Sequence, residues 1–216
     1  MVMAPGKGRT KADFLNLSPS LHERGYDLLL FDPRNTGESE RDKWGFGYFE
    51  SRDILAGIEF SRQEYGDDSF GVLGVSTGAS AALMAALTTD EISAVVADSP
   101  FASIKLAAEN YGNYGTKPFF RLTFPLYMFG ANRMVGVNVA AETNLRERVK
   151  GLETPVLFIH GDGDEVIGPI NSKVLYANKP GSKELWITEG VSHGRSFARR
   201  QEEYEGKVIE FFDKYV

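Results

Sequence analysis

The chain has 216 residues, 42% of them hydrophobic and 25% charged, which is the composition of one ordinary globular domain. It has no cysteine, so thiol nucleophiles, disulfides and cysteine-ligated metal sites are excluded, and its net charge of −6 argues against nucleic acid as a partner. Apolar runs of only a few residues, such as residues 28–31, exclude integral membrane association, and the first residues lack the pattern of a signal peptide. We therefore expect a cytoplasmic protein.

Short apolar runs alternate with helical patterns along the chain. We expect strands at residues 1–4, 26–31, 70–73, 92–96, 155–159 and 185–187. Helices are expected at 11–25 (with Ser18 as cap and Gly25 as stop), 49–65, 79–87 and 169–178, and at the C-terminus, where Tyr204, Val208, Phe211 and Tyr215 share one face. Continuous apolar strands alternating with helices predict an α/β fold with a mainly parallel sheet covered on both faces.

Residues 101–150 interrupt this alternation. The segment holds seven Lys/Arg against three Glu, a net charge of +4, and eight aromatic side chains lie between Phe101 and Phe129. One interpretation is a helical excursion whose aromatic side chains pack on the domain. The other is a cap or lid over a pocket. We interpret residues 1–216 as a single domain with a cap insertion at 101–150.

A G-x-S-x-G motif spans residues 74–78, with Ser76 at its centre. It follows an apolar run and precedes a helix rich in small residues, which is the strand–turn–helix setting that a nucleophilic serine on a sharp turn requires. Side chains two residues before and after the serine would clash there, and glycine removes them. A glycine-rich phosphate turn and an ordinary loop are the alternatives.

Two further loops follow strands. Residues 160–164 read His-Gly-Asp-Gly-Asp, and His193 lies in the loop that precedes the last helix. Both loops belong at the carboxyl ends of strands, where ligands bind in open α/β sheets. A solvated acidic turn, and a hard-cation site formed by Asp162 and Asp164, are alternatives for the first loop.

Ser76, Asp164 and His193 follow one another in the order Ser…Asp…His. With this order the chain resembles the α/β-hydrolase superfamily over nearly its full length, within a subgroup similar to bacterial serine hydrolases of the esterase type. Residues 25–26 with 32–39, residues 98–101 and residues 160–164 look like further segments of that family. The resemblance implies a sheet of about six strands flanked by helices, lacking the family's first two strands, with a helical cap.

The resemblance also implies the role of each residue. Ser76 would be the nucleophile, His193 the base that takes its proton, and Asp164 the acid that holds the imidazole. His160 is the competing base, although its position after a strand also suits a buried structural histidine. Asp98 is a secondary candidate for the acid, and Asp162 a weaker one. His22 is expected to be exposed, and Asp32 and Arg34 to organise their own turn.

The oxyanion hole implied by the resemblance uses two backbone N–H groups. One is that of Thr77, and the other, from the loop at residues 5–8, is that of Lys7. Pro5 stands where the family usually has histidine, so the geometry of this loop departs from the family's pattern.

The leading hypothesis is a serine hydrolase that cleaves small-molecule carboxylic esters with an apolar group, without a cofactor or metal. A thioesterase, a peptidase, a C–C bond hydrolase and a catalytically silent binding protein remain as alternatives. The positive cap is compatible with an anionic substrate or a membrane surface. Residues 28–31 are expected at an open sheet edge, which predicts a lost upstream segment, shielding helices or a partner chain such as a second copy in a homodimer.

Overall fold

A parallel sheet forms the centre of the molecule. The structure, a computed structural model, describes residues 1–111 and 119–216, without the side chain of Arg121. Within these residues six strands pair in the order β2-β1-β3-β4-β5-β6, and every pairing is parallel. The strands are β1 (Val2–Ala4), β2 (Leu29–Leu30), β3 (Phe70–Val75), β4 (Ile92–Asp98), β5 (Val156–Gly161) and β6 (Lys183–Thr188). The α/β sheet of about six strands expected from the sequence is confirmed.

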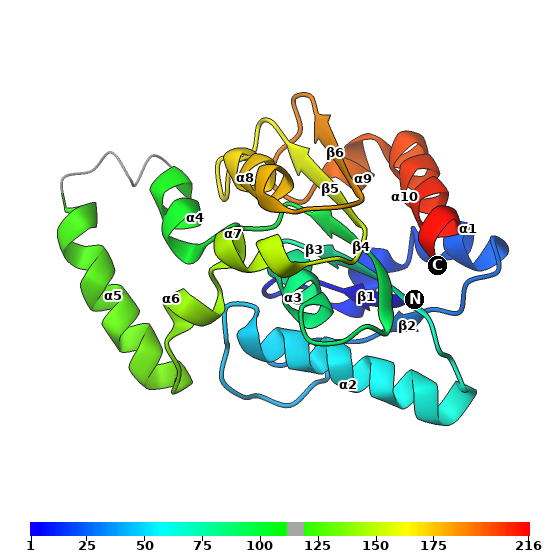
Figure 1. Cartoon of the computed structure of the whole chain (residues 1–216), viewed down its shortest axis with the longest axis horizontal. Helices are drawn as coiled ribbons and strands as arrows, with labels where there is room; N and C mark the ends of the chain where they lie inside the picture. The colour runs from blue at the N-terminus through cyan, green and yellow to red at the C-terminus, as the bar shows by residue number, and fades with distance from the viewer. Residues whose placement is uncertain (112–118) are drawn as a thin grey trace.

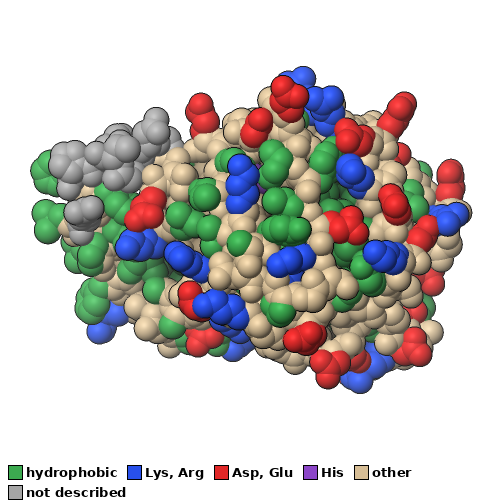
Figure 2. Space-filling model, turned by 45° about the horizontal axis from the view of Figure 1, so that its top comes forward, with side chains coloured by type: hydrophobic (Ala, Val, Ile, Leu, Met, Phe, Trp, Pro, Cys, Tyr) green, Lys and Arg blue, Asp and Glu red, His purple; other side chains and the backbone are tan. Residues whose placement is uncertain are grey.

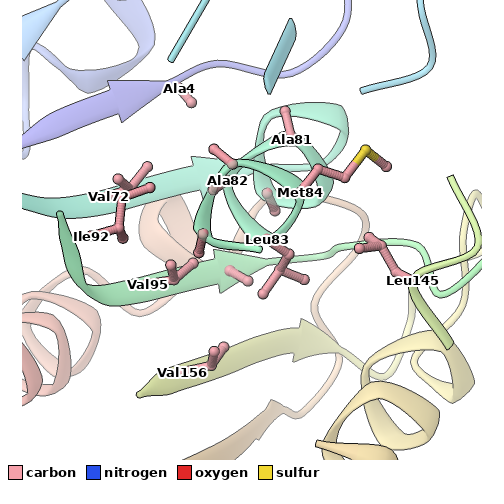
Figure 3. Packing of buried hydrophobic residues seen from close by; sticks show 14 of the residues in the cluster. Ala4, Val72, Ala81, Ala82, Leu83, Met84, Ile92, Val95, Leu145 and Val156 are labelled. Carbon is pink, nitrogen blue, oxygen red and sulfur yellow. The ribbon is translucent and has the colours of Figure 1, made fainter. Parts of the chain in front are cut away.

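Helices cover both faces of the sheet (Figure 1). One face packs against α2 (Tyr48–Tyr65), α3 (Thr77–Ala86) and α8 (Ile170–Asn178), and the other against α1 (Ser18–Glu23) and α10 (Gln201–Tyr215). Figure 3 shows the close packing of the first face, where alanines of α3 lie beside Val72 and Val95 of the strands. Small side chains let α3 approach the sheet closely, and its first residue is thereby held at the end of β3.

The last helix buries the face that its spacing predicts. Tyr204, Val208 and Phe211 are buried against the sheet, and Tyr215 at the end of the helix is half-buried. The expected helices at 49–65, 79–87 and 169–178 are present with small changes of boundary as α2, α3 and α8. Periodicity therefore located these elements correctly.

The expected helix over residues 11–25 is wrong. The segment forms a 3-10 helix, η1 (Lys11–Phe14), and then the separate short helix α1. Proline lacks the N–H that would bond back to the preceding turn, so Pro19 fits only in the first turn of a helix. Ser18 is itself the first helical residue, and its hydroxyl donates to the Phe14 carbonyl at 2.8 Å instead of capping.

Strand β2 lies at the edge of the sheet, as expected for residues 28–31, but only two residues pair. Its side chains are half-buried: Leu29 packs into the core on the α2 side, while Leu28 and Leu30 pack on the opposite face. Gly57 of α2 lies so close that a Cβ there would be 2.8 Å from Leu29 Cδ2. The edge is therefore short and partly shielded by helices of the same chain.

The segment between β4 and β5 carries the helices of the expected cap. These are α4 (Ile104–Asn110), α5 (Phe120–Val135), α6 (Val139–Glu142), α7 (Leu145–Arg148) and the 3-10 helix η3 (Val149–Gly151). Helix α5 lies at one end of the molecule, away from the sheet (Figure 1). Residues 112–118 of the segment lie outside the described residues. Among the described helices, none is long and apolar enough to cross a bilayer.

Candidate active site

Ser76 occupies the turn between β3 and α3 in a strained backbone conformation, with φ 57° and ψ −119°. The glycines of the motif have steric causes. A Cβ on Gly74 would lie 2.4 Å from the Gly78 carbonyl oxygen, and one on Gly78 would lie 2.0 Å from the Ala4 carbonyl oxygen. No side chain fits at either position, so the sharp turn that presents Ser76 needs both glycines.

A continuous chain of hydrogen bonds joins Ser76, His193 and Asp164. His193 Nε2 lies 2.8 Å from Ser76 Oγ, and His193 Nδ1 lies 2.6 Å from Asp164 Oδ2. An ionised carboxylate only accepts, so Nδ1 carries the proton and Nε2 is left to accept the Ser76 hydroxyl. In this tautomer the imidazole can receive the proton of the serine, which is the arrangement that activates a hydroxyl as a nucleophile.

Asp164 lies in the turn after β5 and is held at both oxygens. Its Oδ1 accepts the N–H groups of Val166 at 2.8 Å and Ile167 at 3.0 Å, and its Oδ2 accepts from both His160 and His193. Burial by itself would raise the pKa of this carboxyl, but the bonds from the two histidines outweigh it and hold the pKa well below its usual value. Asp164 therefore carries its negative charge inside the protein.

His160 lies behind Asp164 rather than beside Ser76. It is fully buried, its Nε2 is 2.9 Å from Asp164 Oδ2, and its Nδ1 is 2.7 Å from Ser172 Oγ. Burial lowers its pKa, so the neutral ring donates from Nε2 and accepts the Ser172 hydroxyl at Nδ1. This contact was not predicted from the sequence, although the four-residue spacing of His160 and Asp164 around a strand end was a signal for it.

Asp98, at the end of β4, does not contact His193 through a hydrogen bond. It accepts the Ser99 hydroxyl at 2.8 Å and a hydrogen bond from Tyr204, and complete burial raises its pKa to about 7. Ser99 has a positive φ of 56°, and its Oγ accepts the N–H of Gly194 at 3.2 Å. This cluster therefore fixes the backbone directly after His193.

Thr77 and Lys7 flank Ser76 from two directions. Thr77 is the first residue of α3, and no acceptor among the described residues takes its backbone N–H or that of Lys7. The loop after β1 passes next to the serine, because a Cβ on Gly6 would lie 3.1 Å from Ser76 Cβ. Two free backbone donors are thus available beside Ser76.

The remaining candidates lie outside this cluster. Asp162 accepts the N–H of Gly190 at 2.7 Å, and His22 is exposed on α1. Asp32 accepts the backbone N–H of Glu38 in its own turn, and Arg34 pairs with Asp42 in the same loop. Both also reach outside it, since Asp32 accepts the N–H of Lys11 in η1 and Arg34 pairs with Asp53 of α2. No group of three or more carboxylate or histidine side chains suited to a metal ion occurs among the described residues.

Two cavities open beside Ser76, and they differ in character. The apolar cavity, of about 590 Å³, lies between the sheet end and the helices α4 and α5. Phe101, Ile104, Phe124 and Tyr127 are among its lining residues. The second cavity, of about 820 Å³, includes Ser76 and His193 in its walls. Charged side chains line it beside apolar ones such as Phe14 and Phe197, and we call it the polar cavity because the apolar cavity has no charged lining residue. Figure 2 shows hydrophobic side chains gathered at the left end of the molecule, where Figure 1 places α5.

Comparisons with known proteins agree with this architecture. A family model described as alpha/beta hydrolase fold matches residues 1–125. An uncharacterised protein of Bacillus subtilis, YqkD, is 28% identical over 195 residues, which is 88% of this chain and 63% of that protein. The chain thus spans under two thirds of the length of this relative.

Two solved structures extend the likeness to the whole chain. An esterase of Pyrococcus furiosus has a TM-score of 0.78 and 25% identity, covering 99% of this chain and 82% of its own. A monoacylglycerol lipase of Paleococcus ferrophilus has a TM-score of 0.72 and 20% identity, covering 97% of this chain and 91% of its own.

Proposed function

The chain belongs to the alpha/beta hydrolase fold family, and on this premise we propose that it is a serine hydrolase that cleaves carboxylic esters. The observation that carries the proposal is the hydrogen-bonded chain from Ser76 through His193 to Asp164. Its atoms are arranged for proton transfer away from a serine hydroxyl. A second pair, Ser172 and His160, also contacts Asp164, but both of its residues are fully buried, so Ser76 is the serine of the two that a substrate can reach.

The geometry supports a two-step reaction. In the first step Ser76 Oγ attacks the ester carbonyl carbon while His193 Nε2 takes the hydroxyl proton. The tetrahedral intermediate then collapses, the alcohol leaves with the proton from His193, and an acyl-serine remains. In the second step water attacks the acyl-serine by the same route and releases the acid. Asp164, negative and held at both oxygens, stabilises the imidazolium in each step.

The negative oxygen of the intermediate needs donors on the opposite side from His193. The free N–H groups of Thr77 and Lys7 are proposed for this role, and each such donor contributes roughly 10²–10³ in kcat. They belong to two segments that the sheet brings together, since Thr77 follows β3 and Lys7 follows its neighbour β1.

The apolar cavity supports substrates with an apolar group. Aromatic and aliphatic side chains of α4 and α5 form much of its wall, and we propose residues 101–150 as a cap over the site within a single domain. The esterase and the lipase similar to this chain support hydrolysis of esters as the reaction.

The test is hydrolysis of p-nitrophenyl butyrate by wild type, Ser76→Ala and the control Ser192→Ala. Ser192 is exposed in the loop before His193, and its hydroxyl makes no hydrogen bond in the described structure. We expect Ser76→Ala to lose roughly 10⁴–10⁶ in kcat and Ser192→Ala to keep the wild-type rate. Equal rates in wild type and Ser76→Ala would overturn the assignment.

A fluorophosphonate probe separates an enzyme from a silent binding protein. We expect the probe to label wild type and not Ser76→Ala. A folded wild-type sample that stays unlabelled would favour a binding role. Rates on matched ester, thioester, amide and C–C bond substrates then decide between the reactions that one serine, histidine and aspartate can perform.

A further inference from the structure

The two cavities beside Ser76 have different relations to the proposed machinery. The polar cavity is lined by Ser76, His193 and Gly194, whereas neither Ser76 nor His193 lines the apolar cavity. Both cavities reach Thr77, the proposed oxyanion donor. The carbonyl carbon under attack therefore lies where the two cavities meet.

Proton transfer assigns one half of the ester to each cavity. His193 Nε2 must deliver its proton to the oxygen of the departing alcohol, so the alcohol half has to leave on the side that His193 lines. The acyl half then extends past Thr77 on the other side. Thr77 lines two further cavities, and the acyl half fits the apolar one under α4 and α5, of about 590 Å³, better than the small one of about 180 Å³ beside Lys7. The alcohol half accordingly occupies the polar cavity.

Two cations without a carboxylate partner stand at the wall of the polar cavity. Lys7 places its Nζ 3.8 Å from the centre of the Trp44 ring, and Arg195 is exposed two residues after His193. Among the described residues no carboxylate lies within ion-pair distance of either, whereas Arg9 in the same wall pairs with Asp13 at 2.7 Å. No carboxylate therefore neutralises Lys7 or Arg195, although the Lys7 ammonium lies on the Trp44 ring.

These cations are a local exception in an acidic chain. The net charge of −6 repels anions from the molecule as a whole, so a cavity with two unpaired cations is the place where an anionic group is favoured. Guanidinium and ammonium groups bind carboxylate and phosphate oxygens through charge-assisted hydrogen bonds. The lining residues Asn16 and Gln201 add neutral polar side chains to the same cavity.

We propose that the substrates of this site are esters of an apolar acid with an alcohol that bears an anionic group, a carboxylate or a phosphate, bound by Arg195, with Lys7 adding positive charge to the wall of the same cavity. The proposal rests on the proposed ester hydrolysis and names its substrate class. The apolar acyl chain lies against the cap, and the anionic group of the alcohol lies on the side of Arg195.

Two probes of nearly equal shape test the charge. They are 4-carboxyphenyl butyrate, which is anionic, and 4-carbamoylphenyl butyrate, which is neutral. At low salt we expect kcat/KM to be roughly tenfold higher for the anionic probe, and we expect added salt to reduce this ratio by screening the exposed cations. Added inorganic phosphate should competitively inhibit the hydrolysis of the anionic probe.

Arg195→Gln is the informative variant, and Arg199→Gln is its matched control. Arg199 is also exposed and lies in the neighbouring short helix α9 (Ser196–Arg199), but it does not line the cavity. We expect Arg195→Gln to lower the anionic-to-neutral ratio roughly fivefold to tenfold and Arg199→Gln to keep the wild-type ratio, with thermal melting as the check that both variants fold.

The outcomes separate the two proposals. Hydrolysis of both probes with a ratio near or below one, or a ratio that Arg195→Gln and Arg199→Gln change equally, overturns the anionic substrate and leaves ester hydrolysis standing. Failure of wild type to hydrolyse either probe faster than Ser76→Ala overturns the hydrolase itself, and the substrate class with it.

Discussion

Helices α3 and α5 both border the proposed active site, yet they are packed in opposite ways. Every residue of α3 from Gly78 to Ala86 is buried, and its start is clamped against the loop after β1. Helix α5 turns Met128, Ala131 and Val135 inward but leaves Leu122 and Leu126 more than 70% exposed. The helix that follows the proposed nucleophile is thus fixed by backbone contacts, whereas the helix that borders the proposed acyl site is held by a few apolar side chains.

This difference agrees with what each region has to do. The proposed reaction requires Ser76, His193 and Asp164 to keep their mutual positions within a few tenths of an ångström, and dense packing achieves that. Accommodating an acyl chain requires a surface that can adjust, and side chains with exposed neighbours can do so. We expect substitutions near α3 to damage the fold and the rate together, and substitutions in α5 to change which substrate is preferred.

Replacing Gly78 of α3 and Gly130 of α5 by alanine should show the largest difference between the two helices. In Gly78→Ala the added Cβ would meet the backbone oxygens of Ala4 and Pro5, so we expect more than about 3 kcal/mol of lost stability and loss of ester hydrolysis. In Gly130→Ala the added Cβ meets nothing within 4 Å, so we expect a gain of about 0.5–1 kcal/mol. Urea unfolding measures both, and equal effects would contradict the comparison.

The buried Asp98 should make stability depend on pH. Its pKa is raised from 3.8 to about 7 by burial, so between these values the unfolded chain loses the proton while the folded protein keeps it. The free energy of unfolding contributed by this group therefore falls as pH rises from about 4 to 7, by roughly 2–4 kcal/mol.

The variant Asp98→Asn should remove this slope, so that its stability relative to wild type rises over the same pH range. Glu109→Gln in helix α4 is the control, because that carboxyl is partly exposed beside Lys105, and the stability curve of this variant should run parallel to that of wild type. Thermal melts from pH 4 to 7 test this, and a wild-type slope retained in Asp98→Asn would refute it.

Replacement of His160 should alter the pH profile as well as the rate. In His160→Phe, Asp164 loses one donor and the Ser172 hydroxyl loses its acceptor, so we expect kcat to fall roughly 10–100-fold. With one donor fewer, the Asp164 carboxylate stabilises the imidazolium form of His193 more strongly. The fall of kcat/KM on the acid side of its pH profile should therefore begin at a higher pH than in wild type. His160→Gln, which can still donate to Asp164, should restore part of both effects. An unchanged acid limb in His160→Phe would indicate a purely structural role.

The cap should show the smallest effect, and one that depends on the substrate. Phe124 lines the apolar cavity, and Leu122 lies exposed on the same helix without lining it. We expect Phe124→Ala to raise KM roughly tenfold for octanoyl esters and little for acetyl esters, since only the longer chain contacts the ring. Leu122→Ala should match wild type on both. A loss that is equal for the two chain lengths would place Phe124 outside the acyl site.

Local pattern was sufficient for much of the architecture. Apolar runs located the strands, and the spacing of Tyr204, Val208 and Phe211 gave the buried face of α10. The failure at residues 11–25 was also local in origin, because Pro19 permits a helix to begin but not to continue through it. The packing of α2 against β2 joins residues that are far apart in the chain, so residues 28–31 alone could not predict it.

For the site, sequence patterns were enough to show which groups stand at strand ends. The glycines at 74 and 78 and the loops that carry Asp164 and His193 follow from composition and spacing. Only the tertiary structure decided the partners of the two candidate histidines. His160 lies near the end of β5 and His193 in the loop after β6, yet His193 reaches Ser76 across 117 residues of chain, while His160 contacts Asp164 from the other side. The physical reason is the order of strands in the sheet, which sets distances that local spacing does not contain.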